Sequence, residues 1–172
     1  MIAIVPRTPG DGIDMAARRA ARLASVQAIY QMELTGLGAE VVIEEFRAHR
    51  FPPDLELTPA GRPDEDFFSD VVRGVPRCQS DIDVAIAKCL ADDWKFSRID
   101  SILRAILRAG AYELIARPDV PAKAVIDEYL EITHAFFQGD EAGFVNVALD
   151  RIARDKRGAE MGKTLRDEDP QV

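Results

Sequence analysis

The stretch from residue 106 to residue 154 constrains the fold more than any other part of the chain. It contains three segments with helical periodicity, and only two very short connections join them. Pro118 and Pro121 lie in the first connection and Gly139 lies in the second, so each helix must end close to the start of the next. Connections this short make consecutive helices fold back on each other. The sequence therefore predicts an all-α bundle.

Helical periodicity extends over most of the chain. Between residues 98 and 116, for example, apolar side chains recur at i, i+3, i+4 and i+7, as on the buried face of an amphipathic helix. Ser97 and Asp140 are the expected N-caps of this helix and of the last one, and Gly110 is expected to admit a closely packed neighbour. The result is a compact bundle of six to seven helices, expected at 15–34, 39–49, 63–90 (kinked or split near Pro76), 98–116, 121–137 and 140–154.

The two ends of the chain and one internal segment lack this periodicity. Residues 1–14 combine prolines and glycines without a sustained pattern, and residues 155–172 are charged and poor in apolar side chains. We expect a flexible N-terminal tail and a disordered C-terminal tail around a single domain at 15–154. The segment 50–65 (RFPPDLELTPAGRPDE) contains four prolines, which predicts a surface loop.

The composition is that of a soluble globular protein, with 47% hydrophobic and 30% charged residues in a chain of 172. No apolar run approaches the roughly 18 residues that span a bilayer, and the N-terminus does not resemble a secretory signal. We therefore expect a cytoplasmic protein that does not enter a membrane.

No catalytic, metal or cofactor site is evident. Cys78 and Cys89 are eleven residues apart in a helical pattern, about 16 Å along a helix, which is too far for a disulfide. His49 and His134 are isolated from other ligands. The sequence also contains no glycine-rich phosphate loop and no recognisable set of nucleophile and base. We therefore expect a protein that is not an enzyme and has no cofactor or metal.

The first helix carries the strongest indication of a binding site. Arg18, Arg19 and Arg22 project within an arc of roughly 100° on an ideal helix, and guanidinium groups bind phosphates through paired hydrogen bonds. Cations at a helix N-terminus oppose the helix dipole, which favours a functional reason for their presence. The alternative is an ordinary solvated helix face. Because the net charge is −8, we expect weak nucleic-acid binding unless a basic partner assists.

In the last helix, Phe144 lies at the edge of the expected core stripe. An aromatic ring at such an edge can stack on a nucleobase, or it can simply cover the core. The residues alone leave both roles open.

Four segments together resemble the NusB family of transcription antitermination factors. The likeness covers about residues 16–154, and its segments are ARRAARLASVQAIYQMELTG (17–36), ILRAGAYELI (106–115), DVPAKAVIDEYLEI (119–132) and FVNVALDRIAR (144–154). This chain departs from the family pattern at three positions, one of which is Val147, where the family usually has Gly. It also has Asp127 where the family usually has Asn, and Leu103 where an acidic residue is frequent.

The resemblance implies a fold of two packed three-helix lobes without enzymatic activity. It also implies pairing with NusE, a small-subunit ribosomal protein, and binding of the pair to the single-stranded boxA element of nascent RNA. Through that pair the protein acts indirectly on the RNA polymerase elongation complex, notably in ribosomal RNA operons. The residues that fall on the family's RNA-contacting positions are Arg18, Arg19, Arg22, Lys123, Asp140 and Phe144.

Two alternatives remain at this stage. One is a helical module that binds only protein, with the arginines merely solvated. The other is a stand-alone relative of the N-terminal domain of RNA cytosine methyltransferases, although we expect neither a catalytic domain nor a cofactor-binding loop in 172 residues of this composition. The sequence also leaves open whether the protein forms a homodimer.

Overall fold

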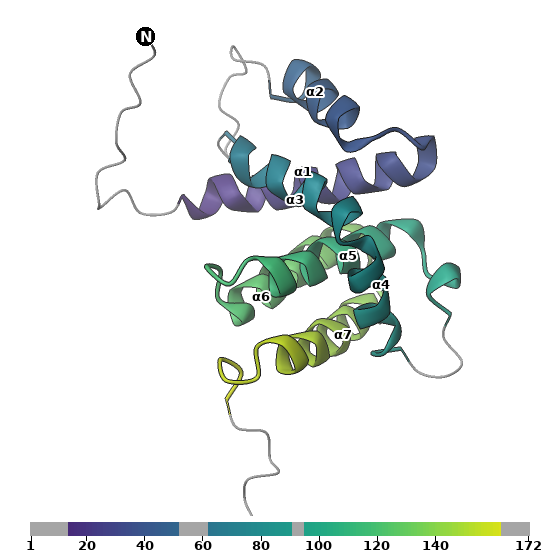
Figure 1. Ribbon diagram of the computed structural model, residues 1–172, viewed down its shortest axis with the longest axis vertical. Helices are drawn as coiled ribbons and strands as arrows, with labels where there is room; N and C mark the ends of the chain where they lie inside the picture. Colours follow the sequence, from purple (N-terminus) through teal and green to yellow (C-terminus); the bar gives the residue numbers. More distant parts are fainter. Residues whose placement is uncertain (1–13, 52–61, 91–94, 163–172) are drawn as a thin grey trace, which may run out of the picture.

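Within the residues that the structure describes, every regular element is a helix (Figure 1). The structure is a computed structural model that describes residues 14–51, 62–90 and 95–162. The prediction of an all-α bundle is confirmed. The helices are α1 (Met15–Thr35), α2 (Ala39–His49), α3 (Glu65–Arg77), α4 (Gln79–Ala87), a short 3-10 helix η1 (Phe96–Arg98), α5 (Ser101–Ala116), α6 (Ala122–Phe136) and α7 (Glu141–Lys156).

Local signals in the sequence set most of the helix ends. Gly36 ends α1 in the left-handed conformation with φ 72°, and its N–H donates to the carbonyl oxygen of Met32. Pro76 stands in the last turn of α3, and α4 begins three residues later, so the expected split is confirmed. Because proline lacks the N–H that a continuous helix requires, one long helix cannot run through this position.

The start of α5 differs from the prediction. The helix begins at Ser101, and Asp100 rather than Ser97 is its N-cap. The Asp100 carboxylate accepts hydrogen bonds from the N–H groups of Ile102 and Leu103, at 2.8 and 3.3 Å. An ionised carboxylate at a helix N-terminus satisfies free N–H groups and opposes the positive end of the helix dipole.

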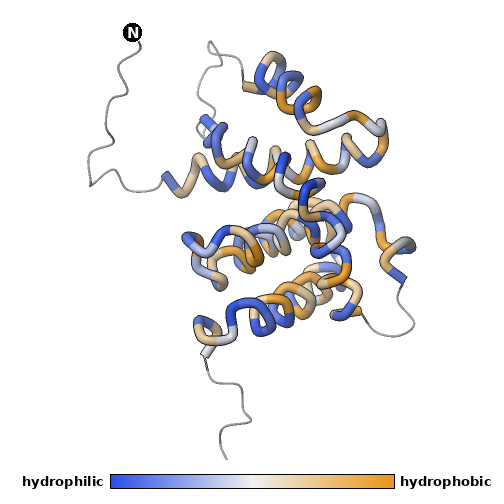
Figure 2. The backbone as a smooth tube through the Cα atoms, in the orientation of Figure 1, coloured by the Kyte–Doolittle hydropathy of each residue, from blue (hydrophilic) through white to orange (hydrophobic). Residues whose placement is uncertain are grey.

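The helices form two groups that lie against each other (Figure 1). In the first group α1, α2 and α3 pack together, and in the second α5, α6 and α7 do so. Contacts of α1 and α3 with α5 join the two groups, and α4 packs mainly on α5. Hydrophobic and hydrophilic residues are interspersed along helices such as α1 and α7, as expected of amphipathic helices in a bundle (Figure 2).

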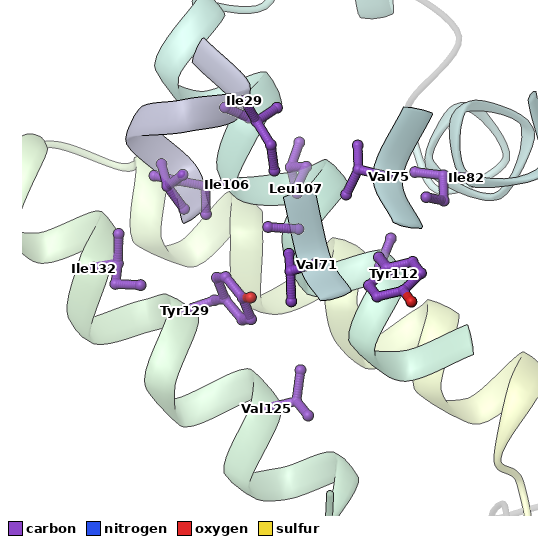
Figure 3. Packing of buried hydrophobic residues seen from close by; sticks show 14 of the residues in the cluster. Ile29, Val71, Val75, Ile82, Ile106, Leu107, Tyr112, Val125, Tyr129 and Ile132 are labelled. Carbon is purple, nitrogen blue, oxygen red and sulfur yellow. The ribbon is translucent and has the colours of Figure 1, made fainter. Parts of the chain in front are cut away.

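The joint between the two groups is tightly packed around α1 and α5. Ala21, Ala24 and Ala28 form a buried stripe of small side chains on α1, which lets neighbouring helices approach closely. Within the second group, a β-carbon added at Gly110 of α5 would lie 3.0 Å from a methyl carbon of Leu149 in α7. The expected close approach at Gly110 is therefore confirmed. Figure 3 shows Ile106, Leu107 and Tyr129 in the core around this joint.

The folded chain continues beyond the expected end of the domain. The helix α7 runs to Lys156, and the side chain of Arg157 is only 8% exposed. Its guanidinium donates hydrogen bonds to the carbonyl oxygens of Glu113 (2.7 Å) and Leu114 (2.8 Å), and to those of Arg117 and Val120. Residues 155–162 therefore belong to the fold, in contrast to the expected tail at 155–172, because Arg157 donates to carbonyl oxygens at and just after the end of α5.

Other expectations fall outside the described residues. These are the flexible tail up to residue 13, the proline-rich loop over residues 52–61 and the tail after residue 162. None of the helices in the described part of the chain is long and apolar enough to cross a membrane.

Candidate nucleic-acid interface

The first two turns of α1 present the three arginines that the sequence singled out. Asp14 begins the helix, because its carboxylate accepts a hydrogen bond from the N–H of Ala17 at 3.0 Å. From this start, α1 extends along α3, α5 and α6. The three guanidiniums consequently meet different neighbours, although they are close in sequence.

Arg22 lies inside the protein. Its side chain is 2% exposed, and its Nε and Nη2 atoms donate to the two carboxylate oxygens of Glu113 at 2.9 and 3.0 Å. Burial lowers the pKa of Arg22, but the hydrogen bonds and negative charge of Glu113 raise it by more, so Arg22 stays charged. This position does not fit the expected RNA contact of Arg22, because Glu113 accepts from two of its donors and the surrounding helices shield the side chain from solvent.

The buried pair of Arg22 and Glu113 joins the two groups of helices. Arg22 belongs to α1, and Glu113 belongs to α5 and is fully buried. Removing one member of such a pair leaves an unpaired charge in the interior, which typically costs about 3–5 kcal/mol. Arg22 therefore stabilises the fold beneath the candidate interface and does not lie on the surface of that interface.

Arg18 occupies an intermediate position. Its side chain is 15% exposed, and its Nε lies 3.7 Å from an oxygen of Asp64. The guanidinium also stacks over the ring of Phe67, with 4.8 Å between the guanidinium carbon and the ring centroid. Arg22 and Arg117 approach the same ring at 5.0 Å. Packing around Phe67 thus holds Arg18 against α3 and leaves only its edge accessible.

Arg19 is the most accessible of the three arginines, with a side chain that is 65% exposed. Its Nε and Nη2 atoms donate to the carboxylate oxygens of Glu128 in α6, at 3.0 and 2.9 Å. The Glu128 side chain itself is 9% exposed. Hydrogen bonds from Arg19 lower the pKa of Glu128 by more than burial raises it, so this carboxyl is ionised at neutral pH.

A shallow groove borders Arg19 between α1 and α6. Its volume is about 460 Å³, and most of its lining is apolar. Glu131 adds a carboxylate to one side. The lining residues are Ala16, Arg19, Ala20, Leu23, Glu131, Ile132 and Ala135. A flexible strand that contacts Arg19 would therefore find apolar surface beside a charged group.

A second groove of about 390 Å³ lies farther along α1, where α2, α5 and α6 meet it. Its walls include Tyr30, Phe46 and Ile102, and its rim includes Leu34 and Phe136, whose side chains are exposed. Exposed apolar surface of this kind is typical of sites that bind another protein.

The comparisons with known proteins agree with this geometry and decide the family. The NusB family model matches residues 19–154. Two curated proteins named transcription antitermination protein NusB are each 54% identical to the chain over 140 residues. The protein from Maricaulis maris aligns over 81% of this chain and 88% of its own length. The one from Caulobacter vibrioides aligns over 81% and 94%. The chain belongs to the NusB family.

Solved structures of the NusB family share the fold. The structure of T. maritima NusB superposes with a TM-score of 0.69 at 29% sequence identity, covering 83% of this chain and 95% of that one. A structure described as the antitermination factors NusB and NusE in complex with double-stranded RNA gives a TM-score of 0.65 over 82% and 98% of the two chains. At 21% identity this second likeness supports the fold alone.

The other three residues with an expected RNA role lie on the second group of helices. Lys123 is exposed in the first turn of α6, and Asp140 is exposed at the N-cap position of α7, where its side chain makes no capping hydrogen bond. Phe144 is half-buried on α7 and packs against the core. Among the described residues, no ion pair joins Asp140 to the three arginines.

The sequence alone did not identify the two carboxylates that give the arginines different environments. Glu113 and Glu128 are 91 and 109 residues away from their partners. The only local signal was the position of Glu113 in a helix that is otherwise apolar on several sides, where a charged residue needs a partner. The sequence around Glu113 or Glu128 does not indicate which arginine each carboxylate pairs with.

Proposed function

We propose that this NusB-family chain is a transcription antitermination factor that binds boxA-type single-stranded RNA together with NusE. Family membership is the observation that carries this proposal, because the matched relatives bear that name and align over most of both chains. A solved structure described as NusB and NusE in complex with double-stranded RNA contains the same two kinds of partner, although its likeness to this chain shows the fold alone. In this role the protein acts on the RNA polymerase elongation complex as an adaptor, and its chemistry is binding.

Arg19 is the leading candidate for a phosphate contact. It is the exposed member of the arginine group, and its guanidinium has five N–H donors, of which the pair with Glu128 uses two. Arg18 contributes through its accessible edge. We assign further contacts to Lys123, Asp140 and Phe144 on α6 and α7, with Phe144 stacking on a base and Asp140 accepting a hydrogen bond from one.

NusE is expected to strengthen RNA binding by the complex. With a net charge of −8, the chain alone repels a polyanion over most of its surface. A basic ribosomal protein supplies the missing positive charge. The apolar groove at Leu34 and Phe136 is the described surface that best suits such a protein partner.

A binding titration with the Arg19→Ala variant tests the function. Fluorescence anisotropy would follow a labelled boxA RNA as purified protein is added, with and without NusE. We expect weak binding by the protein alone, tighter binding with NusE, and a loss of about tenfold in the variant, since a charge-assisted hydrogen bond contributes about 1.5–3 kcal/mol.

The Arg73→Ala variant is the matched control for that titration. Arg73 is also exposed and also makes two hydrogen bonds to one carboxylate, that of Glu40 in α2. The Arg73→Ala substitution removes the same positive charge, but from the side of the molecule that α2 and α3 form. Equal RNA binding by wild type and Arg19→Ala would refute the Arg19 assignment. Binding of NusE without any RNA binding would favour a module that recognises protein alone.

A further inference from the structure

The pair of Arg19 and Glu128 has a geometry that both orients and neutralises the exposed guanidinium. The two parallel hydrogen bonds, at 3.0 and 2.9 Å, fix the plane of the Arg19 guanidinium against α6. They engage the Nε and Nη2 donors, so the Nη1 edge remains for a ligand. The carboxylate is nearly buried and the guanidinium is largely exposed, so a ligand reaches Arg19 without first reaching Glu128.

Each of the other two arginines of the group has a nearer carboxylate than Glu128. Arg22 has its own carboxylate in Glu113, and Arg18 lies beside Asp64. Glu128 also keeps its charge in neutral solution, since its pKa is lowered by Arg19. A phosphate that binds Arg19 must therefore share the guanidinium with a permanent negative charge on the opposite side.

We propose that Glu128 limits the strength with which this protein binds RNA, by sharing Arg19 with the phosphate. This inference rests on the proposed RNA-binding function and names a residue that tunes it. Repulsion between carboxylate and phosphate weakens the contact, while the paired geometry keeps Arg19 in place. The protein alone is then a weak RNA binder by construction, and firm binding depends on positive charge from a partner.

The Glu128→Gln variant separates the charge of this residue from its orienting role. Glutamine keeps a carbonyl oxygen that accepts one hydrogen bond from Arg19, but it carries no charge. We expect boxA RNA to bind the isolated variant about fivefold more tightly at low salt, as one unit charge near a phosphate in solvent allows. We also expect the log–log salt dependence to steepen by about 0.7, because one more phosphate charge is neutralised.

Asp127→Asn is the matched control. It makes the same change in net charge on the neighbouring residue of α6, whose side chain is exposed. Among the described residues Asp127 forms no ion pair with Arg19. The proposal requires a clearly larger gain in affinity for Glu128→Gln than for Asp127→Asn. Equal gains would mean a general charge effect, and weaker binding by Glu128→Gln would mean that orientation dominates; either outcome overturns the proposal.

The double variant Arg19→Ala/Glu128→Gln shows whether the effect passes through Arg19. We expect no gain in RNA affinity over Arg19→Ala alone, and a gain of the full size would overturn the proposal. If Arg19→Ala binds RNA as tightly as wild type, the Arg19 contact itself fails and this inference falls with it. If Arg19→Ala weakens binding but Glu128→Gln brings no gain, only the role of Glu128 is refuted. Circular dichroism of each variant would verify that the helices are intact.

Discussion

Arg22 shows how much the surroundings of a single residue decide its role. It is three residues from Arg19 on the same helix, yet it is buried in a two-bond pair with Glu113 while Arg19 faces solvent. Burial of a guanidinium is tolerated only with a well-placed carboxylate. At the residue scale, the arginine motif therefore combines an internal ion pair with one accessible cation.

Gly74 gives the sharpest test of packing at the same scale. A β-carbon at this position of α3 would lie 2.1 Å from the Cζ atom of Tyr112, whose ring is buried and whose hydroxyl bonds to Asp70. We expect Gly74→Ala to lower the free energy of unfolding by about 3 kcal/mol, since overpacking displaces the ring. Urea denaturation followed by circular dichroism would measure it.

Gly143 provides the matched control for that substitution. It lies in α7, and a β-carbon there meets nothing within 4 Å. Gly143→Ala should raise the free energy of unfolding by about 0.5–1 kcal/mol, because alanine loses less backbone entropy in a helix. A stable Gly74→Ala variant would contradict the packing of Tyr112 against α3.

At the scale of elements, the segment after α7 connects three helices. Arg157 binds the carbonyls at the end of α5, and the carboxylate of Glu160 accepts a hydrogen bond from the N–H of Ala122 at the start of α6. One short segment thus caps the negative end of one helix with a cation and the positive end of the next with an anion. Arg157 and Glu160 thus bond to both ends of the connection between α5 and α6, just before Lys123.

We expect Arg157→Ala to destabilise the protein by about 3 kcal/mol, because four backbone carbonyls lose a hydrogen bond from a charged donor. Urea denaturation would measure the change. Lys156→Ala is the control, since Lys156 is exposed and its one ion pair among the described residues is with its neighbour Asp155, and its effect should stay within about 0.5 kcal/mol. Similar stability of both variants would show that the capping contacts contribute little.

At the scale of the whole molecule, ion pairs link the groups of helices and make stability depend on pH. The pKa values of Glu128 and Asp119 are lowered, chiefly by hydrogen bonds from Arg19 and Arg117. A carboxyl with a lowered pKa binds a proton less readily in the folded state than in the unfolded state. Its contribution to stability is complete above the unfolded pKa of about 4 and disappears as pH falls through the lower folded value.

We therefore expect the melting temperature to fall as the pH drops below about 4. The difference in melting temperature between wild type and Glu128→Gln should be largest near neutral pH and should shrink in acid, where wild type also loses the charge. Thermal unfolding followed by circular dichroism at a series of pH values would measure both curves. A difference that does not change with pH would contradict the ion pair between Arg19 and Glu128.

Much of the secondary structure could be predicted because its causes are local. The helix at 39–49 was expected with the bounds that α2 has. The split at Pro76 and the end of α1 before Gly36 follow from the backbone properties of proline and glycine. The start of α5 was misplaced because Ser97 and Asp100 are both capable N-caps, and only the backbone conformation chooses between them.

The sequence by itself determined the all-α class, the positions of the helices and the resemblance to one family, because periodicity and turn residues act over a few positions. Only the tertiary structure decided what each arginine does. Glu113 and Glu128 reach Arg22 and Arg19 from 91 and 109 residues away, and the packing of α5 and α6 against α1 brings them there. Exposure and ion pairing depend on such distant neighbours, so three similar residues in one motif acquire three different environments.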